Sequence, residues 1–219
     1  MVWDLAPHDI SIILHILGEL PLTVNCQGNA HVTSGIEDVT NLSLSFRNKK
    51  FATIQSSWLE PRKVREMTIV GTRRMIVYDD LQPLEKIRVY DVRVDRPPHY
   101  DTFAEFHYSY HYGDSYIPHI QQEEPLKVEC QHFIDCIESG MEPTTSGRSG
   151  LELVTILEAA TASLKANGAP VNFLRKRDDE QAPGGSAESR FGRRYRPMLA
   201  TLARDVPSGE GWIFEVKWD

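Results

Sequence analysis

The sequence predicts an α+β fold, with an open, mostly antiparallel sheet of five or six strands flanked by helices. Three observations support this fold class. Apolar residues recur at helical spacing over residues 4–17, apolar and polar residues alternate from residue 23 to about 94, and two further helical patterns follow residue 124. A run of strands followed by helices is typical of α+β domains. The 219 residues are enough to bury a sizeable hydrophobic core.

Residues 4–17, with the sequence DLAPHDISIILHIL, predict an amphipathic helix that ends near Gly18 and Pro21. Its apolar side chains share one face, and the opposite face carries Asp4 and His8, four residues apart. A carboxylate can fix the tautomer of a histidine and make it a better base, so this pair could act as a general base. A capping aspartate beside an ordinary surface histidine explains the same spacing.

The alternation after residue 23 predicts the sheet. The segments NLSLSF and FATIQSSW, separated by NKK, indicate a hairpin, and REMTIVG, RRMIVYDD and EKIRVYDVRV continue the series. One face of the sheet should be buried and the other rich in Ser, Thr and Gln. Residues 95–120 are rich in Tyr, His and Pro, and we expect an extended excursion there rather than a packed element.

Two helices are predicted beyond the sheet. The first begins with Pro125 in its first turn and ends at Gly140. The second has Ser or Thr cap candidates at residues 144–146 and Gly168 as its terminator.

Charge and cysteine content limit the functional classes. The net charge of −7 lies entirely in residues 1–175 and disfavours a nucleic-acid-coating role. Cys26, Cys130 and Cys136 have no framework spacing, and no secretory signal pattern opens the sequence, so we expect a cytoplasmic protein. No apolar run approaches the roughly 20 residues of a membrane span.

Three stretches, in this order, resemble the C-terminal domain of the Gfo/Idh/MocA oxidoreductases, especially the nucleotide-sugar dehydrogenases: WDLAPHDIS, SSWLEPRKVREMTIVGTRRMIVYDD and EEPLKVECQHFIDCIESGMEPTTSGRSGLELVTILEAATASLKANGAPV. The resemblance covers residues 1–174. It implies hydride transfer between a sugar carbinol carbon and NAD(P), with Asp4 and His8 as catalytic residues of a D-x-x-x-H element. It also implies a domain that forms the substrate wall and the oligomer contacts.

The cofactor half of that family has no counterpart in this sequence. The family's Rossmann domain carries a glycine-rich loop after a strand and a lysine in an E-K-P element, whereas TSGRSG at residues 145–150 follows no predicted strand. We therefore expect no Rossmann domain, no cofactor bound by this chain and no turnover by the chain alone. The expected partners are a sugar or nucleotide-sugar ligand and a second copy through the sheet face, but neither a membrane nor nucleic acid.

Further candidate residues lie beyond the helix. Arg62 and Arg65 could contact a nucleotide-sugar phosphate, and Tyr112 could contact a sugar. The alternative is that these three are ordinary solvent-exposed side chains at the rim of the domain. His107 and His111 are four apart and suggest zinc, but no further ligands have suitable spacing, so we expect no metal site.

The end of the sequence has a different character. Residues 175–194 are charged and glycine-rich and predict a disordered linker. In residues 195–219, PMLA followed by WIFEVKWD resembles the start of the adenylation domain of bacterial ATP-dependent DNA ligases, which implies Lys217 as a nucleophile in a truncated K-x-D-G motif. A peripheral strand or flexible tail is the simpler interpretation. The chain could be a truncated or fused reading frame, and the alternative functions are a ligase-related fragment or a non-catalytic oligomerisation or binding module.

Overall fold

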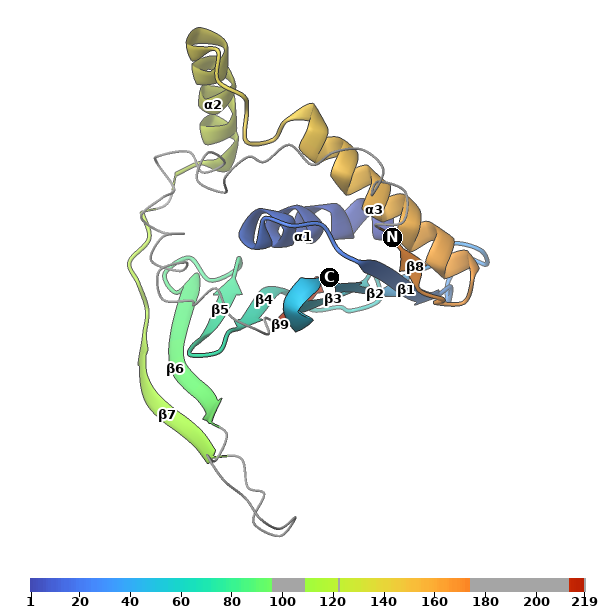
Figure 1. The fold of residues 1–219 in the computed structure, drawn as a ribbon, viewed down its shortest axis with the longest axis horizontal. Coiled ribbons are helices and arrows are strands. Elements are labelled where there is room, and N and C mark those ends of the chain that lie inside the picture. Colours follow the sequence, from blue (N-terminus) through green and yellow to red (C-terminus); the bar gives the residue numbers. More distant parts are fainter. Residues whose placement is uncertain (96–108, 122, 174–212, 219) are drawn as a thin grey trace.

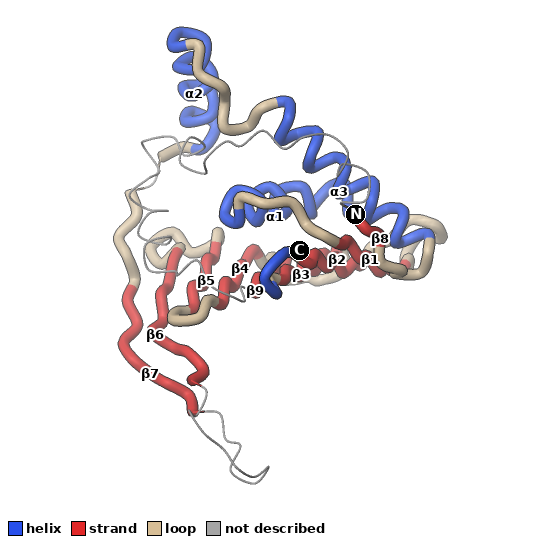
Figure 2. The backbone as a smooth tube through the Cα atoms, in the orientation of Figure 1, coloured by secondary structure: helices blue, strands red, loops and turns tan. Residues whose placement is uncertain are grey.

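The computed structural model describes residues 1–95, 109–121, 123–173 and 213–218, which form an α+β fold (Figure 1). The described strands make one open sheet in the order β7-β6-β5-β4-β9-β3-β2-β1-β8. Helices α1 and α3 lie along one face of this sheet, and α2 stands apart from it (Figure 2). The predicted fold class is confirmed, but the sheet has nine strands among the described residues rather than five or six.

The sheet is mostly antiparallel, and the pairing of β3 with β9 is parallel. The strands are β1 (Thr23–Asn29), β2 (Val39–Ser45), β3 (Phe51–Ser57), β4 (Arg65–Val70), β5 (Met75–Asp79), β6 (Ile87–Asp95), β7 (Ser109–Tyr116), β8 (Val171–Asn172) and β9 (Ile213–Trp218).

Helix α1 spans Val2–Leu17 and confirms the first predicted helix. It ends at Gly18, whose φ of 66° places it in the left-handed region and whose amide donates to the carbonyl of Leu14. Its apolar stripe packs into the core above the sheet, and the buried apolar side chains of the helix are Val2, Ala6, Ile10 and Ile13.

The predicted hairpin is formed by β2 and β3. Leu42 lies opposite Ile54, and Leu44 lies opposite Ala52, so alternate apolar side chains meet on the face that α1 covers. The connecting turn contains η1 (Arg47–Lys49) and Lys50, and these residues include the predicted NKK signal at 48–50. As expected, the opposite face of these strands presents Ser, Thr and Gln side chains.

Strand β9 lies in the middle of the sheet, between β3 and β4. Its Phe214 and Val216 are fully buried in the core. The expectation of a peripheral strand or flexible tail was therefore wrong for Ile213–Trp218. Its alternating apolar residues are those of a half-buried strand, but its neighbours are about 150 residues away in sequence, so local patterns could not place it.

Strand β7 corrects a second expectation. Residues 109–116 form an edge strand paired with β6, with an irregularity between Tyr90 and Val92, rather than an unpaired excursion. Tyr, His and Ser dominate this strand, so it lacks the apolar alternation by which the other strands were identified. The remainder of the expected excursion, residues 96–108, lies outside the described residues.

Helices α2 (Pro125–Ser139) and α3 (Gly147–Lys165) confirm the last two predicted helices. The Glu124 side chain caps α2, and the Ser146 hydroxyl caps α3 by accepting from the amide of Ser149. Helix α3 packs on β1 and α1. None of the described helices has the length and apolar character to cross a membrane. The predicted linker, residues 175–194, lies outside the described residues.

Candidate functional site

Asp4 and His8 lie in the first two turns of α1, and both are exposed. Their spacing of four residues puts them on the same side of the helix, one turn apart. A hydrogen bond joins the start of the helix to α3: the indole Nε1 of Trp3 donates to the Thr161 hydroxyl at 2.9 Å. Pro7 lies inside the helix and has no amide hydrogen to donate. The predicted pair is thus presented to solvent on a helix that is fixed at its beginning.

Asp9 is a further residue of interest that the sequence patterns did not single out. It follows His8 directly, but its side chain is completely buried on the core side of α1. Aspartate is seldom fully buried, because removing a carboxylate from water costs free energy that the surroundings must offset. The available signal was its position on the apolar stripe, four residues before Ile13 and three after Ala6. We regard Asp9 as a positioning candidate beneath the exposed pair.

A polar cluster around Asp80 is a second feature that was only partly anticipated. The Asp80 carboxylate accepts from the Tyr78 hydroxyl at 2.9 Å and from Lys86 Nζ at 2.9 Å, and Arg65 Nη1 lies 3.6 Å from its other oxygen. The hydrogen bond from Lys86 lowers the pKa of Asp80 against the opposing effect of burial. Burial, followed by the hydrogen bond to Asp80, raises the pKa of Tyr78, so the phenol stays protonated at neutral pH.

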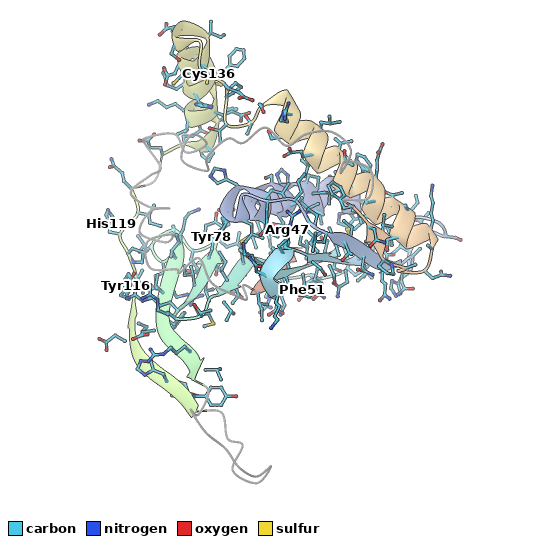
Figure 3. All side chains as sticks on the ribbon, viewed as in Figure 1. Arg47, Phe51, Tyr78, Tyr116, His119 and Cys136 are labelled. Carbon is cyan, nitrogen blue, oxygen red and sulfur yellow. The ribbon has the colours of Figure 1, made fainter. Side chains whose placement is uncertain are left out.

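This cluster lies on the same side of the sheet as α1. Tyr78 pairs with the buried Met67 across β4 and β5, and paired residues share a face. Figure 3 shows Tyr78 on the side of the sheet that faces α1. Tyr78 also packs against the core beneath the helices. Of the predicted substrate residues, Arg65 therefore lies on the helix-covered face, bound to Asp80. The acidic pair that ends the YDD segment was the available sequence signal for this cluster.

Arg62 and Tyr112 occupy other parts of the molecule. Arg62 is exposed in the connection between β3 and β4. Tyr112 is exposed on the edge strand β7, where its ring lies 6.3 Å from that of Tyr110. β7 is four strand positions from β9, which corresponds to about 19 Å at the usual strand spacing. The structure therefore does not bring Tyr112 together with the strands directly beneath α1.

The histidines considered for zinc do not form a metal site within the described part of the chain. His111 Nε2 lies 3.3 Å from an oxygen of Asp91, and His107 lies outside the described residues. No group of three or more His, Cys, Asp or Glu side chains suited to a metal ion occurs among the described residues.

The described residues include no strand-to-helix loop of the kind that binds dinucleotides. The segment 145–150 leads into α3 from the turn after α2, whereas a dinucleotide loop joins a strand to a helix. The described strands likewise contain no adjacent parallel pair joined by a single helix, since β3 and β9 are separated by most of the chain.

Lys217 lies on the open face of the sheet, where its Nζ is 3.7 Å from Glu215 Oε1. Its Cα partners are Gln55 in β3 and Glu66 in β4. Both members of the Lys217–Glu215 pair are more than half exposed, so this ion pair contributes little to stability. Lysine in an exposed sheet face is an ordinary structural arrangement, and nothing at this position supports the ligase interpretation.

Comparisons with known proteins bear on the described fold. Residues 1–77 match the model of the GFO/IDH/MocA C-terminal domain. No curated protein matches the chain.

Several solved structures share the fold. The UDP-N-acetylglucosamine 3-dehydrogenase GnnA from Acidithiobacillus ferrooxidans is 20% identical, with a TM-score of 0.58 over 75% of this chain and 48% of that one. The aldose-aldose oxidoreductase from Caulobacter crescentus is 17% identical, with a TM-score of 0.59 over 78% and 47%. The WlbA dehydrogenase from Bordetella pertussis, solved with NADH and UDP-GlcNAcA, is 17% identical, with a TM-score of 0.53 over 78% and 44%. None of these three proteins is a DNA ligase.

The chain spans about half the length of these neighbours. The shared part covers 75–78% of this chain, and the identities of about 20% establish the fold alone. Sequence and structure point to the same domain, since the matched residues 1–77 contain α1 and most of the first five strands. The chain therefore has the fold of the C-terminal domain of the Gfo/Idh/MocA oxidoreductases, and its first 77 residues match that domain in sequence.

Proposed function

We propose that the chain forms the substrate-side half of an NAD(P)-dependent sugar or nucleotide-sugar dehydrogenase. The observation that carries this proposal is the exposed Asp4 and His8 pair on α1, in a fold shared with sugar and nucleotide-sugar oxidoreductases. The buried Asp9 and the Asp80 cluster add polar groups on the same side of the sheet.

Oxidation of a carbinol removes a proton from the hydroxyl oxygen and a hydride from the carbon. In our proposal His8 accepts the proton, and Asp4, one turn away, orients the imidazole. Arg65 and Lys86 supply positive charge on the helix-covered face, where a nucleotide-sugar phosphate would be attracted. In our proposal the hydride acceptor is a nicotinamide held by a separate cofactor domain, since the described residues include no strand-to-helix loop of the dinucleotide-binding kind.

Helix α2 offers a surface for such a domain. Cys136 is its only buried residue, and several large apolar side chains of the helix are exposed: Leu126, Phe133, Ile134 and Ile137. Contiguous exposed apolar side chains mark interaction surfaces in soluble proteins. The neighbours are about twice as long as the region that they share with this chain.

The isolated chain tests the first part of this proposal. Incubated with NAD or NADP and candidate UDP-sugars or aldoses, it should give no nicotinamide reduction. Robust reduction by the purified chain would show that it does not depend on a separate cofactor domain.

A chimera tests the chemistry. The part of the Acidithiobacillus ferrooxidans neighbour that lies outside its match to this chain, fused before Met1, should give measurable sugar oxidation. His8→Asn should then lower kcat by about 100-fold or more, the usual contribution of a general base. His15→Asn, two turns further along the same helix, is the matched control. An active chimera in which His8→Asn behaves like the control would refute the assigned role.

A further inference from the structure

Strands β3 and β4 follow one another in sequence but do not pair. The short connection 58–64 joins them, and the position between them in the sheet is filled by Ile213–Trp218. All six residues of β9 have a Cα partner on both sides, parallel in β3 and antiparallel in β4. The first part of the chain thus forms a sheet with a slot one strand wide, which β9 completes.

The space between β3 and β4 accommodates a strand whose apolar side chains alternate with polar ones. On the core side it buries Phe214 and Val216, which are among the largest fully buried side chains of the protein. On the open side Glu215 and Lys217 remain exposed. The Thr53 hydroxyl adds a hydrogen bond to the carbonyl of Phe214. A strand with this alternation fits, and a slip by one residue would bury the charged side chains.

The contacts of β9 do not depend on which copy of the chain supplies it. It packs against β3, β4 and α1, all within the first 70 residues, while residues 174–212 separate it from the end of β8. Because β9 is far in sequence from the strands that it pairs with, it can make the same contacts in its own molecule or in a second copy.

We propose that β9 is an exchangeable strand, and that two copies form a dimer in which Ile213–Trp218 of each completes the sheet of the other. Reciprocal exchange fills both slots and leaves no unpaired edge in the centre of either sheet. A strand in the same chain as its partner strands competes with a second copy as an effective local concentration, which is typically in the millimolar range for flexibly joined segments. The closed monomer therefore dominates at micromolar concentration, and the exchanged dimer forms when the protein is concentrated. This inference is independent of the proposed enzymatic role.

Cysteine cross-linking in the full chain tests the exchange. Thr68 and Glu215 face each other across β4 and β9, on the open side of the sheet. In a Cys130→Ser background, which removes the exposed native thiol, one variant carries Thr68→Cys and another carries Glu215→Cys. The two variants are unfolded together, refolded at about 1 mM, within the range of that local concentration, and oxidised. A disulfide-linked heterodimer should form, and refolding at micromolar concentration should reduce its yield by at least tenfold.

Two controls make the result decisive. Asn41→Cys replaces Thr68→Cys in the first, since Asn41 is exposed on the same face but lies in β2, which does not border β9. The second carries Thr68→Cys and Glu215→Cys in one chain, which should form an internal disulfide at micromolar concentration. If that internal disulfide forms while the mixture gives no more heterodimer than the Asn41 control, strand exchange is refuted. Failure of the internal disulfide would equally overturn the proposal, since β9 would then not occupy the slot.

Discussion

Phe214 lies directly opposite Ala52 in the parallel pairing of β9 with β3, and neither side chain is exposed to solvent. On its other side Phe214 faces Ile69 of β4. The small side chain of Ala52 leaves room for the large ring, and the core beneath α1 is closed by a residue from the far end of the described chain. This pairing makes β9 part of the structural centre of the protein.

Phe214→Ala should lower the free energy of unfolding by about 3–5 kcal/mol, because it leaves a cavity in the centre of the core. Chemical denaturation followed by circular dichroism would measure the loss. Ile213→Ala, in the same strand but half exposed on the open face, should cost less than about 1 kcal/mol. Equal costs for the two variants would mean that β9 is not seated in the sheet.

Ser163 links α3 to β1. It bonds to β1 at Cys26, just past the two residues of β1 that pair with the short strand β8. Its buried hydroxyl accepts from the amide of Cys26 at 2.9 Å and donates to the carbonyl of Ala169 at 2.7 Å. Ser163→Ala should cost about 1–3 kcal/mol in thermal or chemical unfolding, since it leaves the buried amide of Cys26 without this partner. Thr155→Ala removes an exposed hydroxyl from the same helix and should change stability by no more than about 0.5 kcal/mol.

Asp38 should make stability depend on acid pH. Burial opposes its ionisation, but hydrogen bonds from the ring of His31 and from the amides of Val32 and His31 hold its pKa at about 2. A carboxyl with a lowered folded-state pKa contributes stability above its unfolded value near 4, and that contribution is lost as the pH falls towards 2. Unfolding measured from pH 5 to 2 should therefore show a shallower loss in Asp38→Asn than in the native chain. If Asp38→Asn and the neighbouring control Glu37→Gln follow the same profile, the carboxylate is not the source of the effect.

Lys217 should not form a covalent adduct with ATP. It lies on the exposed sheet face beside Glu215, and the described residues provide no cluster of three acidic or histidine ligands to hold a metal ion near a triphosphate. Incubation with labelled ATP and Mg²⁺ should leave no acid-stable label on the protein. Label at this position, absent from Lys217→Arg, would instead revive the ligase interpretation.

Local patterns in the sequence were sufficient for the elements whose partners are near in the chain. Apolar spacing and Gly18 define α1, the alternation on both sides of NKK defines the β2–β3 hairpin, and Ser146 marks the start of α3. These signals work because helix periodicity, turn chemistry and capping act within a few residues. The D-x-x-x-H spacing likewise identified Asp4 and His8 as neighbours on one helix face.

Only the tertiary structure decided how distant segments meet. The sequence by itself determined that Phe214 and Val216 alternate as in a half-buried strand, but not that β9 separates β3 from β4. It likewise contained Asp9 and Asp80 without showing that Asp9 is buried on the core side of α1 and that Asp80 binds Tyr78, Arg65 and Lys86. A sheet joins strands by backbone hydrogen bonds that are much the same for any partner. The choice of partner therefore rests on which side chains fill the shared core, and that is settled only when the whole sheet assembles.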